Sequence, residues 1–142
     1  MNGDADLVFV DTNVLLYALD DAVPAKYDQA RAWLARLWTT GTGRVSWQVL
    51  HEFYFNATRK LGHPPAAMRQ QVVRFASWKP GDVSLALLQR AWHWMDRANL
   101  AYWDALIVAA AEDCGATLLL SEDLQHGRRF GHCVVQNPFT GD

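Results

Sequence analysis

The sequence predicts an α/β fold with a mostly parallel, twisted sheet and helices on both faces. Two short apolar runs, residues 7–10 and 117–120, each end in a polar turn, as strands buried on both faces do. Segments with apolar residues at helical spacing lie between these runs. Strands that alternate with helices form parallel sheets, and the helices pack on the two faces.

The first strand, at residues 7–10, is followed by two predicted helices at residues 13–19 and 24–38. A proline opens the second helix, where its missing N–H breaks no hydrogen bond. That helix carries an apolar stripe at helical spacing, formed by Tyr27, Ala30, Leu34 and Leu37. Gly41 and Gly43 end this helix.

A brief strand at residues 44–46 precedes a helix that stops near Gly62. The apolar side chains of this helix follow the i, i+3, i+4, i+7, i+11 spacing of one face: Leu50, Phe53, Tyr54, Ala57 and Leu61. A proline pair at residues 64–65 begins the next helix. The Lys-Pro-Gly-Asp segment at residues 79–82 breaks it, because proline and glycine do not continue a helix.

The last part of the chain predicts two helices and two strands. Residues 84–97 form an amphipathic helix with an inward stripe of Leu85, Leu88, Trp92 and Met95. Residues 102–113 are apolar nearly all round in their middle, which indicates a buried helix that ends at a glycine. Strands at residues 117–120 and 132–135 complete the predicted sheet.

The composition is that of an ordinary globular protein. The chain has 142 residues, of which 51% are hydrophobic and 20% are charged, and this length suffices to bury one core. We therefore expect one domain over residues 1–142. The formal charge of -2 does not by itself indicate a polyanion partner. A cluster of catalytic acids would lower the net charge to this value even if basic residues elsewhere contacted a phosphate backbone.

Cysteine usage and hydropathy indicate the compartment. The two cysteines, Cys114 and Cys133, are too few for a disulfide framework and form no CxxC pair. The first residues carry no basic leader, and no apolar run approaches the ~20 residues of a membrane span. We expect a cytoplasmic protein.

Two acids follow directly on the buried strands, where α/β proteins place their ligands. Asp11 follows the first strand, and Asp123 follows the strand at 117–120. Considered alone, Asp11 is interpreted equally well as the N-cap of the next helix. Asn13 is the more natural cap, however, which leaves Asp11 without a local partner. A carboxylate this close to a core needs a compensating partner.

Two further acids lie on predicted helices. Glu52 stands beside the apolar stripe of its helix, and spacing alone favours a surface residue paired with Asn56 or Arg59. Asp104 shares its face with Ile107, Val108 and Ala111. A first-turn Asp can also serve as a cap, but an ionised, unpaired carboxylate is costly in apolar surroundings.

Four carboxylates in one site predict a divalent cation. They would repel one another and hold protons near neutral pH without such an ion. Oxygen-only ligands suit Mg²⁺ or Mn²⁺, and these ions support phosphodiester hydrolysis. We expect metal binding by Asp11, Asp104 and Asp123, whereas Glu52 binds a metal or the attacking water. Glu122 is either a fifth acid or a solvent-facing neighbour of Asp123, and we favour Asp123 as the inner residue.

Competing catalytic motifs are incomplete. His51 and Glu52 begin like the HExxH motif of metalloproteases, but Phe55 stands at the position of the second histidine. A dehalogenase-like phosphatase with Asp11 as its nucleophile needs a second Asp two residues on, where this chain has Asn13.

Several residues near the acids are candidates for binding RNA. Trp47 and Trp103 stand next to the regions of Glu52 and Asp104 and are placed to frame a pocket. The candidates for phosphate contacts are Arg59, Arg128 and Arg129. A solvated loop is an equal interpretation of the last two.

Four segments of the chain resemble the VapC-type toxins of prokaryotic toxin–antitoxin pairs, which belong to the PIN-domain nucleases. They are VFVDTNVLLY (8–17), QVLHEF (48–53), WDALI (103–107) and LSEDL (120–124), and the likeness extends over residues 7–139. The resemblance implies a PIN-like domain with an acidic quartet of Asp11, Glu52, Asp104 and Asp123. It also implies that Asn13 and Ser121 support the first and last acids.

The same resemblance implies an activity and partners. They are metal-dependent endonucleolytic cleavage of RNA, a homodimer, and a cognate antitoxin whose C-terminal segment blocks the acids. The family also includes ribosome-processing and housekeeping nucleases, and a catalytically silent PIN domain would serve as a binding module. The size of the chain favours the toxin, and the intact quartet argues against the silent module.

Overall fold

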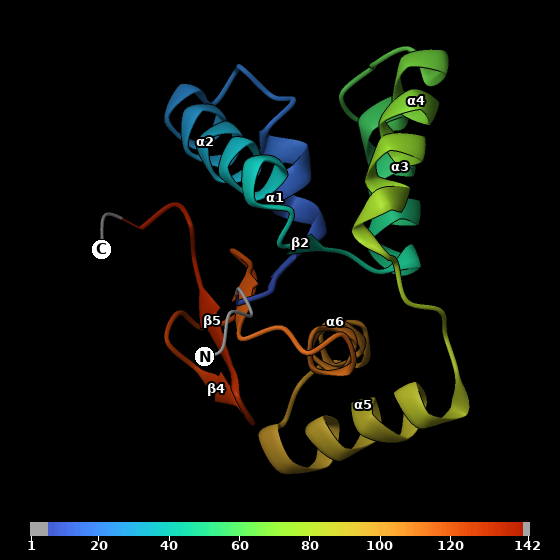
Figure 1. Cartoon of the computed structure of the whole chain (residues 1–142), viewed down its shortest axis with the longest axis vertical. Coiled ribbons are helices and arrows are strands. Elements are labelled where there is room, and N and C mark those ends of the chain that lie inside the picture. Colours follow the sequence, from blue (N-terminus) through green and yellow to red (C-terminus); the bar gives the residue numbers. More distant parts are fainter. Residues whose placement is uncertain (1–5, 141–142) are drawn as a thin grey trace.

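The computed structural model describes residues 6–140 and contains a five-stranded sheet of order β2-β1-β3-β5-β4 (Figure 1). The strands are β1 (Val8–Val10), β2 (Gly43–Arg44), β3 (Leu118–Leu120), β4 (Arg129–Phe130) and β5 (Cys133–Gln136). Neighbouring strands are parallel except β4 and β5, which are antiparallel. The sheet is mostly parallel, as predicted. The predicted lack of a basic leader concerns residues 1–5, which lie outside the described residues.

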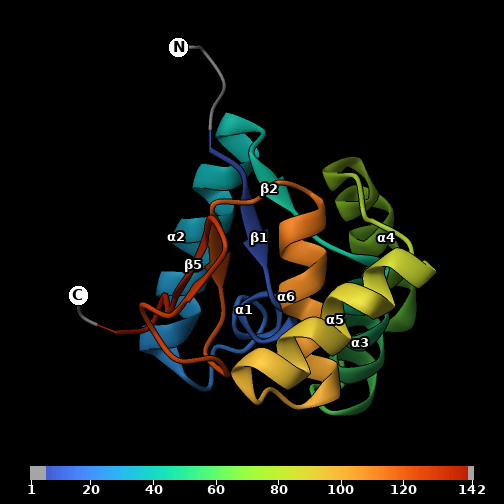
Figure 2. The same cartoon turned by 90° about the horizontal axis from the view of Figure 1, so that it is seen from below.

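Six α-helices are described, and they cover both faces of the sheet. They are α1 (Thr12–Tyr17), α2 (Pro24–Thr40), α3 (Trp47–Arg59), α4 (Pro65–Phe75), α5 (Leu85–Ala98) and α6 (Tyr102–Asp113), with a short 3-10 helix, η1 (Ala76–Trp78), after α4. Figure 2 shows α2 on one side of the sheet and α6, followed by α5, on the other. None of the helices within residues 6–140 has the length and hydrophobicity needed to cross a lipid bilayer.

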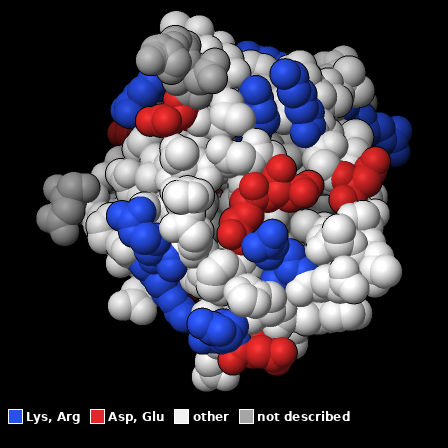
Figure 3. All heavy atoms as spheres, turned by 60° about the horizontal axis from the view of Figure 1, so that its bottom comes forward, with Lys and Arg blue, Asp and Glu red and all other residues white. Residues whose placement is uncertain are grey.

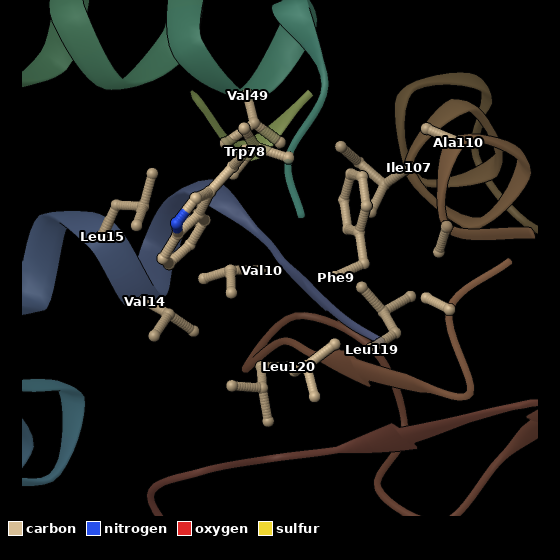
Figure 4. Packing of buried hydrophobic residues seen from close by; sticks show 14 of the residues in the cluster. Phe9, Val10, Val14, Leu15, Val49, Trp78, Ile107, Ala110, Leu119 and Leu120 are labelled. Carbon is tan, nitrogen blue, oxygen red and sulfur yellow. The ribbon is translucent and has the colours of Figure 1, made fainter. Parts of the chain in front are cut away.

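The central strands are apolar throughout because both of their faces are buried. Phe9 and Leu119 point toward α6, whereas Leu120 points to the opposite side, toward α1 (Figure 4). Successive side chains of a strand alternate between the two faces, so each face of the sheet receives apolar residues. Phe9, Leu119 and Leu120 are fully buried. This two-sided core fixes the strand ends from which the acids project.

The cap of α1 is Asp11, not Asn13 as the sequence predicted. The helix begins at Thr12, and the Asp11 carboxylate accepts a hydrogen bond from the Thr12 backbone N–H at 2.7 Å. The chain passes from β1 into α1 with no connecting residue other than Asp11, which has the extended backbone typical of an N-cap. Asn13 is thereby drawn into the first turn of the helix, and its side chain is free for another contact.

The predicted inward stripe of α5 is only half right. Leu85 and Trp92 are 65% and 46% exposed. The buried face is formed instead by Leu87, Leu88, Ala91, Trp94 and Met95. The helix carries apolar residues on two overlapping stripes. Packing selects the stripe that contains Ala91, because this small residue lets α5 approach the alanines of α6 closely.

The sheet has one strand that the sequence pattern did not predict. β4 contains two residues, too few to show the alternation that marks a strand. It pairs with β5 and contains Arg129. The strand predicted at 44–46 ends earlier than expected, at Arg44. Ser46 instead caps α3 by accepting a hydrogen bond from the Val49 N–H.

Candidate active site

The two strand ends that carry acids lie side by side. β1 and β3 are parallel neighbours with Val10 opposite Leu120, so Asp11 and Ser121 emerge together at their carboxyl ends. β2 lies on the other side of β1, and strand order therefore reverses between β1 and β3, where α/β proteins place their sites. The Ser121 hydroxyl donates to the Asp11 carboxylate at 2.8 Å, and both side chains are buried.

Asn13 connects the start of α1 to the loop after β3. Its amide nitrogen donates to the Asp123 carboxylate at 3.1 Å and lies 3.4 Å from an Asp11 oxygen. Its side-chain oxygen accepts from the Glu122 backbone N–H at 3.2 Å. The Ser121 hydroxyl also accepts from the Asp123 N–H at 3.1 Å. Asn13 and Ser121 therefore hold Asp11 and Asp123 on the same side of the strand ends.

Helices α3 and α6 bring the other two predicted acids to the same place. Glu52 accepts a hydrogen bond from the Thr12 hydroxyl at 2.9 Å, whereas Asn56 contacts only the Glu52 backbone carbonyl. The surface pair with Asn56 or Arg59 that spacing favoured is thus not formed by the Glu52 carboxylate. One cavity of about 210 Å³ is lined by all four acids: Asp11, Glu52, Asp104 and Asp123.

Asp104 stands in the first turn of α6 but does not cap the helix. Ala101 is the N-cap, and the structure gives the Asp104 carboxylate no hydrogen-bond partner within residues 6–140. Burial raises the pKa of Asp104, and the charge of Asp123 raises it further. A half-buried carboxylate without a hydrogen bond is costly unless a cation joins it.

Asp11 is the most strongly perturbed acid of the site. Burial raises its pKa from 3.8 to about 7, against the opposing hydrogen bonds from Ser121 and Thr12. The charges of Asp123 and Glu52 add to the increase. Among the described residues, the only ion pair joins Lys26 to Glu122, so none of these four acids is paired with a basic side chain there.

The donor set fits a divalent cation held partly through water. No three of the His, Cys, Asp and Glu side chains within residues 6–140 stand close enough together to hold one ion directly. Mg²⁺ retains several waters and binds through one or two protein carboxylates, so it needs no such cage. The oxygen-only set and the raised pKa values of Asp11 and Asp104 suit an ion of this kind.

Glu122 turns away from the other acids. Its carboxylate forms an ion pair with Lys26 of α2, and this contact raises the pKa of Lys26. The Lys26 ammonium also lies 4.7 Å from the ring centre of Tyr17 and 5.4 Å from that of Phe139. The charge of Glu122 is therefore balanced by Lys26, whereas its neighbour Asp123 faces the cavity of the quartet.

The three arginines proposed as phosphate contacts occupy different settings. Arg59 is exposed and lies over the ring of Phe55. Arg128 donates to the Ala98 carbonyl at 2.8 Å, at the end of α5, and lies over Phe130. Arg129 is exposed on β4. The contacts of Arg128 hold it within the fold.

The sequence interpretation missed Lys60, which lines a second cavity next to the quartet. This cavity of about 290 Å³ shares Asn13, Asn56 and Asp123 with the site. Lys60 follows Glu52 by eight residues on α3 and its C-cap, with Asn56 midway between them. Residues four apart on a helix share a face, so this spacing was the signal that identifies Lys60.

The distribution of charge differs from what the net charge suggests. Acidic side chains gather near the middle of the face shown in Figure 3, and Lys and Arg side chains lie above and below them. A polyanion is repelled by an acidic centre unless cations neutralise it, whereas the surrounding basic residues attract it. This arrangement suits a metal-dependent site for a phosphate-containing substrate.

Comparison with known proteins identifies the fold. The profile of the PIN domain matches residues 8–129, a range that contains all four acids. Among solved structures, the chain is similar to the Mycobacterium tuberculosis toxin VapC20, described as a sarcin–ricin loop cleaving toxin. The two share 25% sequence identity, with a TM-score of 0.62 over 82% of this chain and 91% of that one. No match was found among curated proteins. The chain belongs to the PIN-domain family.

Proposed function

We propose that this PIN domain is a metal-dependent endoribonuclease and the toxin of a toxin–antitoxin pair. The observation that carries this proposal is the quartet: four segments distant in sequence place Asp11, Glu52, Asp104 and Asp123 around one cavity with no basic partner among the described residues. Similarity to VapC20 supports RNA as the substrate class and the toxin as the biological role.

The contacts of the site residues indicate a different role for each of them. Asp11, Asp104 and Asp123 would hold Mg²⁺ or Mn²⁺, partly through bound water, and the ion would supply an activated water and offset the charge of the phosphate. Ser121 and Thr12 fix Asp11, and Asn13 fixes Asp123. The Thr12 hydroxyl occupies one oxygen of Glu52, Oε1. Its other oxygen is left to accept a proton from the attacking water.

The first test measures RNA cleavage by the purified protein. We expect cutting with Mg²⁺ or Mn²⁺ and none after EDTA treatment, because a carboxylate base alone neither lowers the pKa of the attacking water nor offsets the charge of the phosphate. Readdition of the metal should restore activity, which separates chelation from denaturation. Activity that survives thorough chelation would contradict the metal mechanism.

The toxin role is tested in cells. The chain is expressed alone and together with the small open reading frame beside its gene, and growth and RNA integrity are compared. We expect arrest and RNA cleavage only without the neighbour, whose product would direct a basic side chain at the acids, since Arg binds carboxylates bidentately. A chain that cuts RNA in vitro but is harmless alone is a housekeeping nuclease.

The remaining expectations concern assembly and location. A homodimer stays a prediction from the family resemblance, and a cytoplasmic location stays a prediction from cysteine usage and hydropathy. Sedimentation of the purified protein tests the first, and fractionation of the cells that express it tests the second.

We expect RNA affinity to fall with salt, and Lys60 to contribute to that dependence. Each cation that contacts a phosphate releases counterions, so Lys60→Ala should reduce the slope of log Kd against log salt by about 0.7 for each phosphate that Lys60 neutralises. The measurement is a titration of labelled RNA in metal-free buffer at several salt concentrations. Arg128→Ala is the matched comparison and should lower thermal stability while leaving the slope unchanged. Equal slopes for Lys60→Ala and the wild type would show that Lys60 does not contact the RNA phosphates.

A further inference from the structure

A large cavity adjoins the quartet on the side of α3 and α6. It measures about 930 Å³ and is open to solvent. Gln48, Glu52 and Trp103 line both this cavity and that of the quartet, so the two are immediate neighbours. The rest of its wall is contributed by Trp47, His51, Asp82 and Val83. A substrate whose phosphate lies at the acids can therefore reach this cavity with an adjacent group.

The side chain of Trp103 is exposed to solvent where the two cavities meet. Its side chain is 63% exposed, although the residues that follow Asp104 in α6 are buried. Its ring packs edge-on against Tyr102, with ring centres 5.1 Å apart, and this contact leaves much of the indole surface uncovered. The fold does not use Trp103 to fill its core. An exposed indole one residue before a quartet acid is a surface on which a planar ligand can stack.

Gln48 supplies an unused polar group at the same junction. Its amide nitrogen is buried and has no hydrogen-bond partner among the described residues. Buried donors without a partner are uncommon in folded proteins, because each one loses its hydrogen bonds to water. If the Gln48 side chain turns toward the cavity that it lines, an acceptor on a bound ligand would satisfy this donor.

The lining also indicates which part of a nucleic acid fits here. It contains the carboxylates of Glu52 and Asp82 and no Lys or Arg. A phosphate would be repelled by this wall, whereas an uncharged planar base would not. The apolar wall formed by Trp47 and Val83 favours a base further.

We propose that this cavity is a nucleobase subsite that receives the base of a nucleotide next to the scissile phosphate. Trp103 stacks on the base, and the Gln48 amide donates a hydrogen bond to an acceptor on its edge. The subsite rests on the proposed function and extends it, because it makes Trp103 a positioning residue that selects for unpaired nucleotides. A base inside a duplex is already stacked and cannot enter, so single-stranded or looped RNA is favoured.

The test measures binding of a labelled, short single-stranded RNA in metal-free buffer. The parent protein carries Asp123→Asn, which prevents cleavage and lies outside the proposed subsite. We expect Trp103→Ala to weaken binding about ten-fold or more, the size of one base–aromatic stack, and Trp103→Phe to restore much of the loss. Trp92→Ala, which removes another exposed Trp, on α5, is the matched control and should bind as the parent does.

A second measurement separates stacking from a general loss of structure. Abasic nucleotides are placed in turn along the RNA. One position should weaken binding by the parent as much as Trp103→Ala does, and the two changes together should cost no more than either alone. Additive losses at every position would contradict the subsite.

The outcomes distinguish this proposal from the one on which it depends. If the wild-type protein cuts RNA but Trp103→Ala binds it as well as the parent, the subsite is wrong and the nuclease stands. If the wild-type protein neither binds nor cuts RNA, the nuclease proposal fails and the subsite fails with it. If Trp103→Ala retains RNA but is no longer neutralised by the antitoxin, the cavity is a protein-binding surface instead.

Discussion

Replacing any one acid of the quartet by its amide is expected to lower RNA cleavage by about a hundred-fold or more. The variants are Asp11→Asn, Glu52→Gln, Asp104→Asn and Asp123→Asn. Each amide keeps the size of the side chain but removes the charge that holds a cation and balances the transition state. Single-turnover cleavage of labelled RNA with Mg²⁺ or Mn²⁺ measures the loss, and circular dichroism confirms that each variant folds.

Glu122→Gln is the matched control for these four variants. Glu122 neighbours Asp123 in sequence, but its carboxylate is paired with Lys26, so we expect most of the activity to remain. An equal loss in Glu122→Gln and Asp123→Asn would contradict the choice of Asp123 as the inner acid. An Asp104→Asn protein that unfolds, or one that cuts normally, would show that Asp104 is structural.

The central architecture could be predicted because its elements carry strong local signals. The strands β1 and β3 are buried on both faces, so they appear in the sequence as uninterrupted apolar runs. The helix α6 is buried around its middle and was predicted with the bounds that the structure shows, Tyr102–Asp113. Pro24 and Gly41 mark the ends of α2 for stereochemical reasons, and Gly41 takes the left-handed conformation that ends a helix there.

The errors occurred where tertiary contacts decide between local alternatives. Leu85 and Trp92 form an apolar stripe as regular as the one that is buried, and only the close approach to α6 selects between them. β4 exists through its pairing with β5 rather than through a pattern of its own. Asp11 and Asn13 are both good caps by residue type, and the abrupt turn from β1 into α1 assigns the role to Asp11.

The position of the acids could be predicted, and the family resemblance named Asn13 and Ser121 as their supports, but the individual contacts could not be predicted. Asp11 and Asp123 follow buried strands, and that placement alone indicates a common edge of the sheet. The contacts that orient them join residues far apart in the chain. Asn13 and Asp123 are separated by 110 positions, and Lys26 and Glu122 by 96. No local pattern encodes such pairs. Asp123 was favoured as the inner acid from the sequence, but the pairing of Glu122 with Lys26 required the structure.

Asp11→Asn is expected to stabilise the metal-free protein at neutral pH while abolishing activity. Burial raises the pKa of Asp11 from 3.8 to about 7, so the folded protein keeps a proton over a range in which the unfolded chain has lost it. The free energy of unfolding therefore falls as pH rises from about 4 to about 7. A shift of this size corresponds to about 4 kcal/mol at most, since each pKa unit is worth about 1.4 kcal/mol.

The Asn variant has no proton to lose at this position, and its amide oxygen can still cap α1. We expect it to match the wild type near pH 4 and to exceed it at pH 7 and above in chemical denaturation with EDTA present. Asp28→Asn, which changes an exposed residue of α2, should follow the wild type. Added Mg²⁺ should stabilise the wild type more than Asp11→Asn, because an ion that binds the folded state alone stabilises it. Equal pH slopes for Asp11→Asn and the wild type between pH 4 and pH 7 would show that Asp11 is already ionised in the folded protein. In that case the burial of Asp11 would not be the reason why the site needs a cation.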